Sequence, residues 1–121
     1  MKDDRAFLIF ILERIERIEH YTAGGRARFL AHILVQDGVL WNLQVVSESI
    51  QRLSDAAKAQ HPEINWARIA GFRNVLVHNY LGIQLDRVWE VVEEEMPILK
   101  RAVQDLLGGV NGEGDGCAFM D

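Results

Sequence analysis

The stretch DDRAFLIFILERIERIE, residues 3–19, decides the fold class, because its apolar residues recur at helical spacing. In a helix these residues form one continuous stripe, made of Leu8, Ile11, Leu12, Ile15 and Ile18. Asp3 and Asp4 stand before the stripe, where carboxylates favour a helix start. Phe7 and Phe10 widen the apolar surface. The helix is therefore either well covered in a monomer or shared with a dimer partner.

Three further helical segments are expected, and no stretch of the sequence shows sustained strand-like alternation. The second covers about residues 26–59, after Gly24-Gly25, with a possible site of kinking near Gly38. The third covers about residues 65–79, with Asn65 as its N-cap. The fourth covers about residues 86–107, and Pro97 should either kink it or be tolerated with a local distortion. The sequence thus predicts an all-α protein.

The expected core positions of the second and fourth segments recur at helical spacing. They are Val39, Leu43, Val46, Ile50 and Leu53 in the second, and Val88, Val91, Val92, Ile98, Leu99, Val103, Leu106 and Leu107 in the fourth. Residues 1–107 are expected to form a single domain, and residues 108–121, GGVNGEGDGCAFMD, a flexible, acidic, glycine-rich tail.

Composition excludes several classes of protein. The chain of 121 residues has one cysteine, Cys117, so a disulfide framework or a cysteine metal cluster within the chain is excluded. This favours a cytoplasmic location. The longest apolar run near the start, residues 6–12, is far shorter than the roughly 18 residues that a membrane span needs. We therefore expect no membrane association.

Charge is distributed unevenly along the chain. The net charge of −5 argues against a purely electrostatic nucleic-acid binder. However, residues 1–85 carry 10 basic and 9 acidic side chains, whereas residues 86–107 carry 3 basic and 6 acidic ones. The acidity therefore lies in the last helix and the tail, and the nearly neutral remainder is compatible with an RNA ligand.

The string RNVLVHNY, residues 73–80, contains the candidate chemistry. Arg73 stands among apolar neighbours, where a guanidinium is costly unless it is paired or binds an anion. His78 follows Arg73 by five residues, or about 140° around an ideal helix, so one straight helix would not bring the two groups tightly together. They could converge at a frayed helix end, or two helix copies could share a cleft across a dimer.

These residue types suit cleavage of RNA. Histidine titrates near neutral pH and can take the proton of a 2′-hydroxyl, so His78 is the candidate base. Arg73 can stabilise the charge that grows on the phosphorane, and Asn74 can orient a phosphate or the imidazole. No metal or other cofactor is needed for this chemistry. The plain structural alternative is that the helix dipole favours His78 and that Arg73 pairs with a carboxylate such as Glu48.

The wider sequence favours the catalytic interpretation. The segment PEINWARIAGFRNVLVHNYLGI, the following VWEVVEEEMPILK and the upstream LVQDGVLWNLQVVSES closely resemble the HepT-like branch of the HEPN superfamily. The resemblance covers roughly residues 3–107 in order. It implies a compact four- to five-helix up-and-down bundle that forms a homodimer, with an R-x4-H-x-Y motif at a metal-independent endoribonuclease site between the protomers.

Carried over by the resemblance, Arg73 and His78 are catalytic and Asn74 supports them. Tyr80 is then the residue to which a partner nucleotidyltransferase antitoxin adds AMP, which would bring negative charge and bulk to an anion-binding site. Two positions depart from the family pattern, which often has Arg at the place of Trp41 and Gly at the place of Ser47. These departures concern the wall of the cleft and substrate preference.

Two other functions are compatible with the sequence. One is a catalytically inactive HEPN module that binds a nucleotidyltransferase or a nucleotide. The other is a plain helical dimerisation domain in which Arg73 and His78 make internal ion pairs. We expect the tryptophans to lie in the core or at an interface, with base stacking as the alternative, and three histidines to lie on the surface. These residues are Trp41, Trp66 and Trp89, and His20, His32 and His61.

Overall fold

The computed structural model describes residues 2–78 and 84–111, and every regular element in these two ranges is helical. In chain order they are α1 (Lys2–Tyr21), α2 (Arg26–Ala31), α3 (Ile33–Gln51), α4 (Asp55–Ala59), α5 (Trp66–His78), α6 (Leu85–Glu90), a π-helical segment (Val91–Glu95) and α7 (Met96–Asn111). The all-α prediction is confirmed for the described residues.

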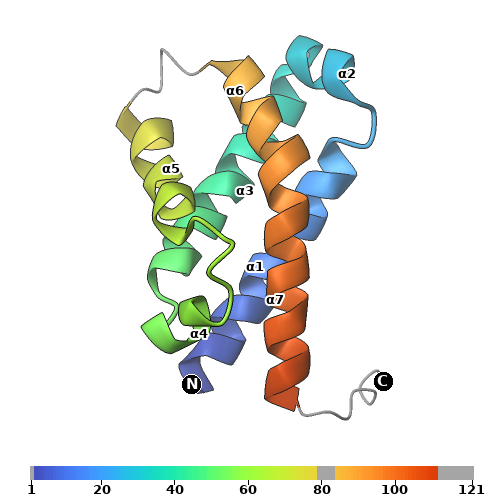
Figure 1. Ribbon diagram of the computed structural model, residues 1–121. Coiled ribbons are helices and arrows are strands. Elements are labelled where there is room, and N and C mark those ends of the chain that lie inside the picture. Colours follow the sequence, from blue (N-terminus) through green and yellow to red (C-terminus); the bar gives the residue numbers. More distant parts are fainter. Residues whose placement is uncertain (1, 79–83, 112–121) are drawn as a thin grey trace.

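The long helices run up and down beside one another (Figure 1). α3 lies between α1 and α5 and packs against both of them, while α7 packs against α1. α1 and α3 are antiparallel, since Tyr21 at the end of α1 lies against Gly38 near the start of α3. Lys100 of α7 donates to Glu19 of α1 at 2.9 Å. The three short pieces α2, α4 and α6 close the ends of this bundle.

The expectation of one helix over residues 26–59 is wrong. The backbone at His32 is extended, with φ −119° and ψ 113°, and separates α2 from α3. A turn at residues 52–54 then separates α3 from α4. Gly38, the predicted kink, lies inside α3, where a Cβ would come within 3.0 Å of the Tyr21 ring. This glycine therefore allows α1 to approach closely and does not bend the helix.

Of the two outcomes expected at Pro97, the structure shows the tolerated local distortion. Proline has no N–H to donate, and its ring crowds the carbonyl four residues earlier, which belongs to Glu93. Glu93 lies in the π-helical turn Val91–Glu95, directly before α7. The wider π turn accommodates the proline without ending the helix. α7 then continues to Asn111, beyond the expected end at residue 107. Residues 112–121 lie outside the described range, so the flexible tail stays a prediction.

The predicted core is largely correct. Every expected core position in the second segment is buried, and so are Leu8, Ile11, Ile15 and Ile18 of α1. Leu12, Val91 and Leu107 are only partly buried and pack at the edge of the core. Ile98 was assigned wrongly, since it is 42% exposed. It directly follows the π turn and Pro97, which shift the helical register on which the assignment relied.

Asp4 lies in the first turn of α1, as expected, and also makes contacts with a distant part of the chain. Its buried carboxylate accepts hydrogen bonds from the backbone N–H of Ser54 at 2.8 Å and from the Ser54 hydroxyl at 2.6 Å. The Ser54 hydroxyl in turn accepts from the N–H of Ala57 at 3.1 Å and caps α4. Asp4 thereby joins α1 to the turn between α3 and α4, which fixes the base of the bundle.

None of the helices in the described ranges combines the length and the apolar character that crossing a membrane would require.

Candidate active site

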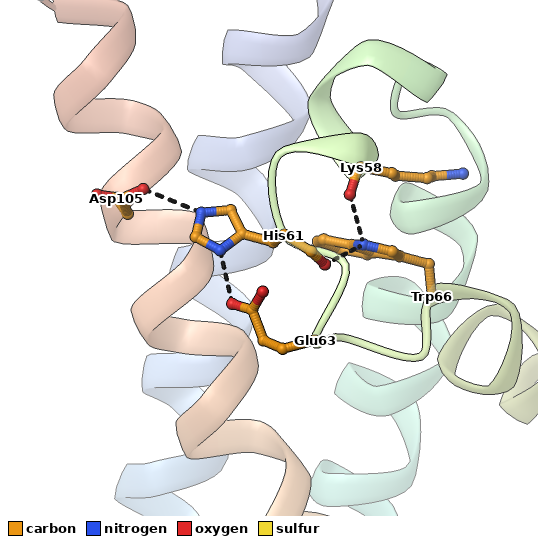
Figure 2. A network of polar contacts seen from close by, with 5 residues as sticks. All are labelled: Lys58, His61, Glu63, Trp66 and Asp105. Atoms are coloured by element: carbon orange, nitrogen blue, oxygen red, sulfur yellow. Dashed lines mark hydrogen bonds and ion pairs between the residues drawn. The ribbon is translucent and has the colours of Figure 1, made fainter.

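The helix that carries the motif, α5, is fixed firmly at its start. The Asn65 side chain accepts a hydrogen bond from the N–H of Arg68 at 3.0 Å, which confirms Asn65 as the N-cap. Beside it, the Trp66 indole N–H is directed at the carbonyl oxygens of Lys58 and His61, each at 3.0 Å (Figure 2). Because Trp66 is also buried, the first turn of α5 is held by both packing and hydrogen bonds.

Two neighbours hold the middle of α5. Ile69 is buried against the core, and the Gln51 amide of α3 donates to the Ala70 carbonyl at 3.2 Å. On another side Arg68 pairs with Glu95 of the π-helical segment, with 2.9 Å between nitrogen and oxygen. These contacts place α5 between α3 and the π-helical segment that precedes α7. Sequence periodicity did not reveal them, because each contact joins residues that are far apart in the chain.

In the loop before α5, His61 contacts two carboxylates (Figure 2). Its Nδ1 lies 2.7 Å from Glu63 and its Nε2 lies 3.0 Å from Asp105 of α7. The bond to Glu63 raises the pKa of His61; burial opposes this, and Asp105 adds to it. The same bond lowers the pKa of Glu63. His20 and His32 are exposed as expected, but the His61 side chain is only 14% exposed, so the surface assignment was wrong for this residue.

This cluster should make stability depend on pH. A raised histidine pKa stabilises the fold fully below the ordinary value of 6.5, and the gain is lost as the pH rises through the folded value. The lowered pKa of Glu63 acts oppositely, and its contribution disappears as the pH falls from the ordinary value of 4.5 through the folded value. We therefore expect the Tm to decrease on going from mildly acidic to alkaline pH.

Thermal unfolding of wild type and His61→Gln across this pH range tests the expectation. The variant should lose part of the alkaline decrease, by a small amount because both carboxylates are largely exposed. His32→Gln changes an exposed histidine and should keep the wild-type profile. Identical pH profiles for wild type and His61→Gln would contradict the role given to this cluster.

The motif residues Arg73, Asn74 and His78 all lie in α5, which ends at His78. Their side chains lie outside the described residues, and so does Tyr80. The helix is continuous from Arg73 to His78, so the separation of about 140° applies to their backbone positions. This continuity disfavours convergence at a frayed end before His78, and the shared cleft of a dimer stays a prediction.

Two further residues of α3 are candidates from the sequence, namely Ser47 and Glu48. Ser47 is fully buried, and its hydroxyl donates to the Leu43 carbonyl at 3.0 Å, so its polar group is satisfied within the helix. Glu48, the candidate partner of Arg73, is exposed on the helix against which α5 packs. Pairing of Glu48 with Arg73 stays a prediction. Within the described part of the chain, no three His, Cys, Asp or Glu side chains are grouped so that they could hold a metal ion.

This helical bundle, with Arg73 and His78 of the R-x4-H-x-Y string on α5, matches a family of known proteins. A model of the family described as "Ribonuclease HepT-like" matches residues 11–106, which include α5 and the helices packed around it. The chain belongs to this HepT-like ribonuclease family.

Individual relatives agree with the family assignment. A protein of Thermococcus cleftensis named "Probable ribonuclease HepT" is 31% identical over 87% of this chain and 96% of its own length. A "Putative RNase" of Methanocaldococcus jannaschii is 29% identical over 93% of each chain. A second protein of that organism, named as a gamma-glutamylcyclotransferase and putative RNase, is 32% identical over 88% of this chain. This chain spans only 48% of that longer protein. No solved structure shows a significant match.

Proposed function

We propose that this protein is the toxin of a toxin–antitoxin pair and acts as a metal-independent endoribonuclease. The observation that carries the proposal is the family match, which covers the helix with Arg73, Asn74 and His78 and most of the bundle around it. The names of all seven relatives and the family description point to ribonuclease activity, and the residue types of the motif suit it.

In the proposed reaction His78 takes the proton of a ribose 2′-hydroxyl. The 2′-oxygen then forms a bond to the adjacent phosphorus, and the bond from phosphorus to the 5′-oxygen breaks. The leaving 5′-oxygen takes up a proton, and the upstream fragment ends in a 2′,3′-cyclic phosphate. Arg73 stabilises the negative charge on the phosphorane, and Asn74 orients the phosphate or the imidazole. The helical separation of Arg73 and His78 supports a cleft that two protomers share.

The proposal includes an off-switch at Tyr80, two residues after His78. A nucleotidyltransferase antitoxin would transfer AMP from ATP to the tyrosine hydroxyl and release pyrophosphate. Each AMP group places a negative phosphate beside a cleft that must accept a phosphate of RNA. Like charges would then exclude the substrate without any change in the fold.

The first test is cleavage of RNA by the purified wild-type protein in the presence of EDTA. We expect cleavage to persist, with upstream fragments that end in a cyclic phosphate, as shown by mass spectrometry of the products. Cleavage that stops with EDTA would rule out the metal-independent mechanism. A preparation that binds a nucleotidyltransferase but does not cleave RNA would instead favour the inactive binding module.

A further inference from the structure

Two arginines on one side of the bundle stack on phenylalanine rings of α1 instead of pairing with acids. The Arg14 guanidinium lies 4.6 Å from the centre of the Phe10 ring, and the Arg52 guanidinium lies 5.9 Å from the centre of the Phe7 ring. Within the described ranges, neither arginine forms an ion pair with a carboxylate. Stacking of this kind holds the planar guanidinium against a ring and leaves N–H groups for an anion.

Arg14 has few hydrogen bonds for a partly buried guanidinium. Its Nη1 donates to the Asn42 side chain of α3 at 3.4 Å, which is long for such a bond, and its buried Nε has no partner among the described residues. The Asn42 amide nitrogen donates to the Gly38 carbonyl at 2.7 Å and so fixes the orientation of Asn42. A guanidinium has five N–H donors, and its partial removal from water is costly unless acceptors compensate. An anion at this junction of α1 and α3 would supply such acceptors.

Trp41 directly precedes Asn42 and is 59% exposed beside the same junction. On an ideal helix it lies about midway between Asn42, on the side of α3 that contacts α1, and Gln51, on the side that contacts α5. Exposed aromatic rings that alternate with arginines are typical of surfaces that bind single-stranded nucleic acid, because bases stack on the rings and arginines contact phosphates. We call five residues the stacking strip: Phe7, Phe10, Arg14, Trp41 and Arg52.

We propose that the stacking strip holds single-stranded RNA on one side of the bond that is cleaved. A base stacks on Trp41, and Arg14 and Arg52 contact phosphates of neighbouring nucleotides. Asn42, which contacts Arg14, and Arg52 are ten residues apart, or about 15 Å along the helix axis, so the two arginines suit separate phosphates of one strand. The role of this RNA as a substrate rests on the proposed function, whereas the contacts within the strip do not.

The packing of α3 and α5 connects the strip with the motif helix. Gln51, the last residue of α3, donates to Ala70 of α5, and the two helices run in opposite directions (Figure 1). Eight residues lead from Ala70 forward to His78, and eight lead from Gln51 back to Leu43. Trp41 therefore lies on α3 close to the level at which α5 ends. A strand whose reacting phosphate lies at α5 would cross α3 at Trp41 and continue along the junction of α1 and α3.

The acids of α3 agree with this direction. On an ideal helix the exposed Asp37 and Glu48 lie about 40° and 20° from Trp41, on its α5 side. Arg52 lies about 20° from Trp41 on its α1 side. The phosphates of the bound strand are therefore expected on the α1 side of the indole, away from both carboxylates.

Binding of a fluorescent, 2′-O-methylated oligoadenylate to the full chain tests the strip by anisotropy. The blocked 2′-hydroxyls prevent the proposed cleavage, so the measurement does not depend on catalysis. We expect wild-type protein to bind this probe with a Kd that rises with salt concentration. Arg14→Ala and Arg52→Ala should each lower the slope of log Kd against log salt by about 0.7, the value for one phosphate of a single strand. Arg52→Ala changes an exposed residue, so it tests the strip even if Arg14→Ala disturbs the fold.

Trp41→Ala should act differently from the two arginine variants. It should raise the Kd by about 5- to 150-fold, the usual loss for one base stacked on an aromatic ring, and should leave the salt slope unchanged because no charge is removed. Trp41→Phe keeps an aromatic ring and should lose less affinity. The matched control for charge is Arg101→Ala on α7, at an exposed position opposite the buried Leu99 and Val103, and it should keep the wild-type slope.

Wild-type protein that does not bind the probe at low salt would overturn the proposal. So would salt slopes that Arg101→Ala lowers as much as Arg14→Ala and Arg52→Ala. A Trp41→Ala variant that binds the probe normally, but has a changed molar mass by light scattering, would overturn it as well and assign the indole to contact with a protein.

Cleavage of unmodified RNA on the same samples separates this proposal from the proposed function. Binding that depends on the strip, in a protein that never cleaves RNA, would support the strip and refute the ribonuclease. Cleavage by a protein whose binding is unaffected by changes at Arg14, Trp41 and Arg52 would support the ribonuclease and refute the strip.

Discussion

Replacing His78 with alanine should lower the rate of RNA cleavage by about 10²- to 10⁴-fold, the usual contribution of a positioned acid–base group. Arg73→Ala should cost roughly 10²- to 10³-fold, because the charge on the phosphorane would lose its cation. Both variants should also lose the ability to inhibit growth. Single-turnover cleavage of a labelled RNA with EDTA present gives these rates without a contribution from substrate exchange.

The control for this result lies on the same helix. Arg68 precedes Arg73 by five residues, and its side chain, which is 59% exposed, pairs at 2.9 Å with the partly buried Glu95. Arg68→Ala removes a cation from α5 at a stability cost of up to about 1 kcal/mol and should keep cleavage near the wild-type rate. Equal loss of activity in Arg68→Ala and Arg73→Ala would show that any positive charge on this helix suffices.

Stability measurements on the same variants separate catalysis from a structural role. If Arg73 and His78 form internal ion pairs in a plain dimerisation domain, Arg73→Ala should strongly lower the Tm. A catalytic arginine at an open cleft should instead lose activity with little loss of stability. A large decrease in Tm together with unchanged RNA cleavage would contradict the catalytic assignment.

The core of the bundle could be predicted because burial follows helical periodicity closely. The stripe from Leu8 to Ile18 and the row from Val39 to Leu53 needed only the spacing of apolar residues. Periodicity failed at Ile98, where a π turn changes the number of residues per turn. Pro97 indicated that a distortion would occur, but not how far it would rotate the residues that follow.

The break at His32 is harder to predict, since neither glycine nor proline marks it. The Gln36 amide of α3 donates to the carbonyls of Phe29 and Leu30 at 3.0 and 3.1 Å and thereby satisfies the end of α2. The change of chain direction between α2 and α3 is also stabilised by the burial of Phe29. Both causes depend on tertiary contacts, which local propensity does not contain.

The candidate site, like the fold, could be predicted from the sequence only in part. Sequence placed Arg73, Asn74 and His78 on one helix with Asn65 as its cap, and the structure agrees. The anchoring of that helix by Trp66 and Gln51 depends on distant parts of the chain. The proposed site between two copies could not be recognised from burial in one chain, because a surface that contacts another molecule is exposed when the chain is alone. Trp41 illustrates this, because its exposure excludes the core, and an interface and base stacking stay the two predictions for it.

The largest effect on stability is expected at Phe29, where alanine should lower the free energy of unfolding by about 3–5 kcal/mol. Phe29 is fully buried, and its ring lies 5.5 Å from the Trp89 ring of α6 at an angle of 36°. The substitution would leave a cavity and remove an aromatic contact that joins α2 to α6. The Arg26–Asp86 ion pair joins the same helices at 2.8 Å, but it is exposed and offers little compensation.

Leu30→Ala is the matched control, because it shortens the next residue of the same helix at a partly exposed position. Urea unfolding should show a much larger decrease for Phe29→Ala than for Leu30→Ala. In a double-mutant cycle, Phe29 and Trp89 should be coupled by about 0.5–1.5 kcal/mol, since their rings are in contact. Similar small losses for both single variants would mean that α2 docks without burying Phe29. α2 contacts α6, the next helix after α5 in the chain. Loss of Phe29 should therefore weaken first the end of the bundle where α2 and α6 lie.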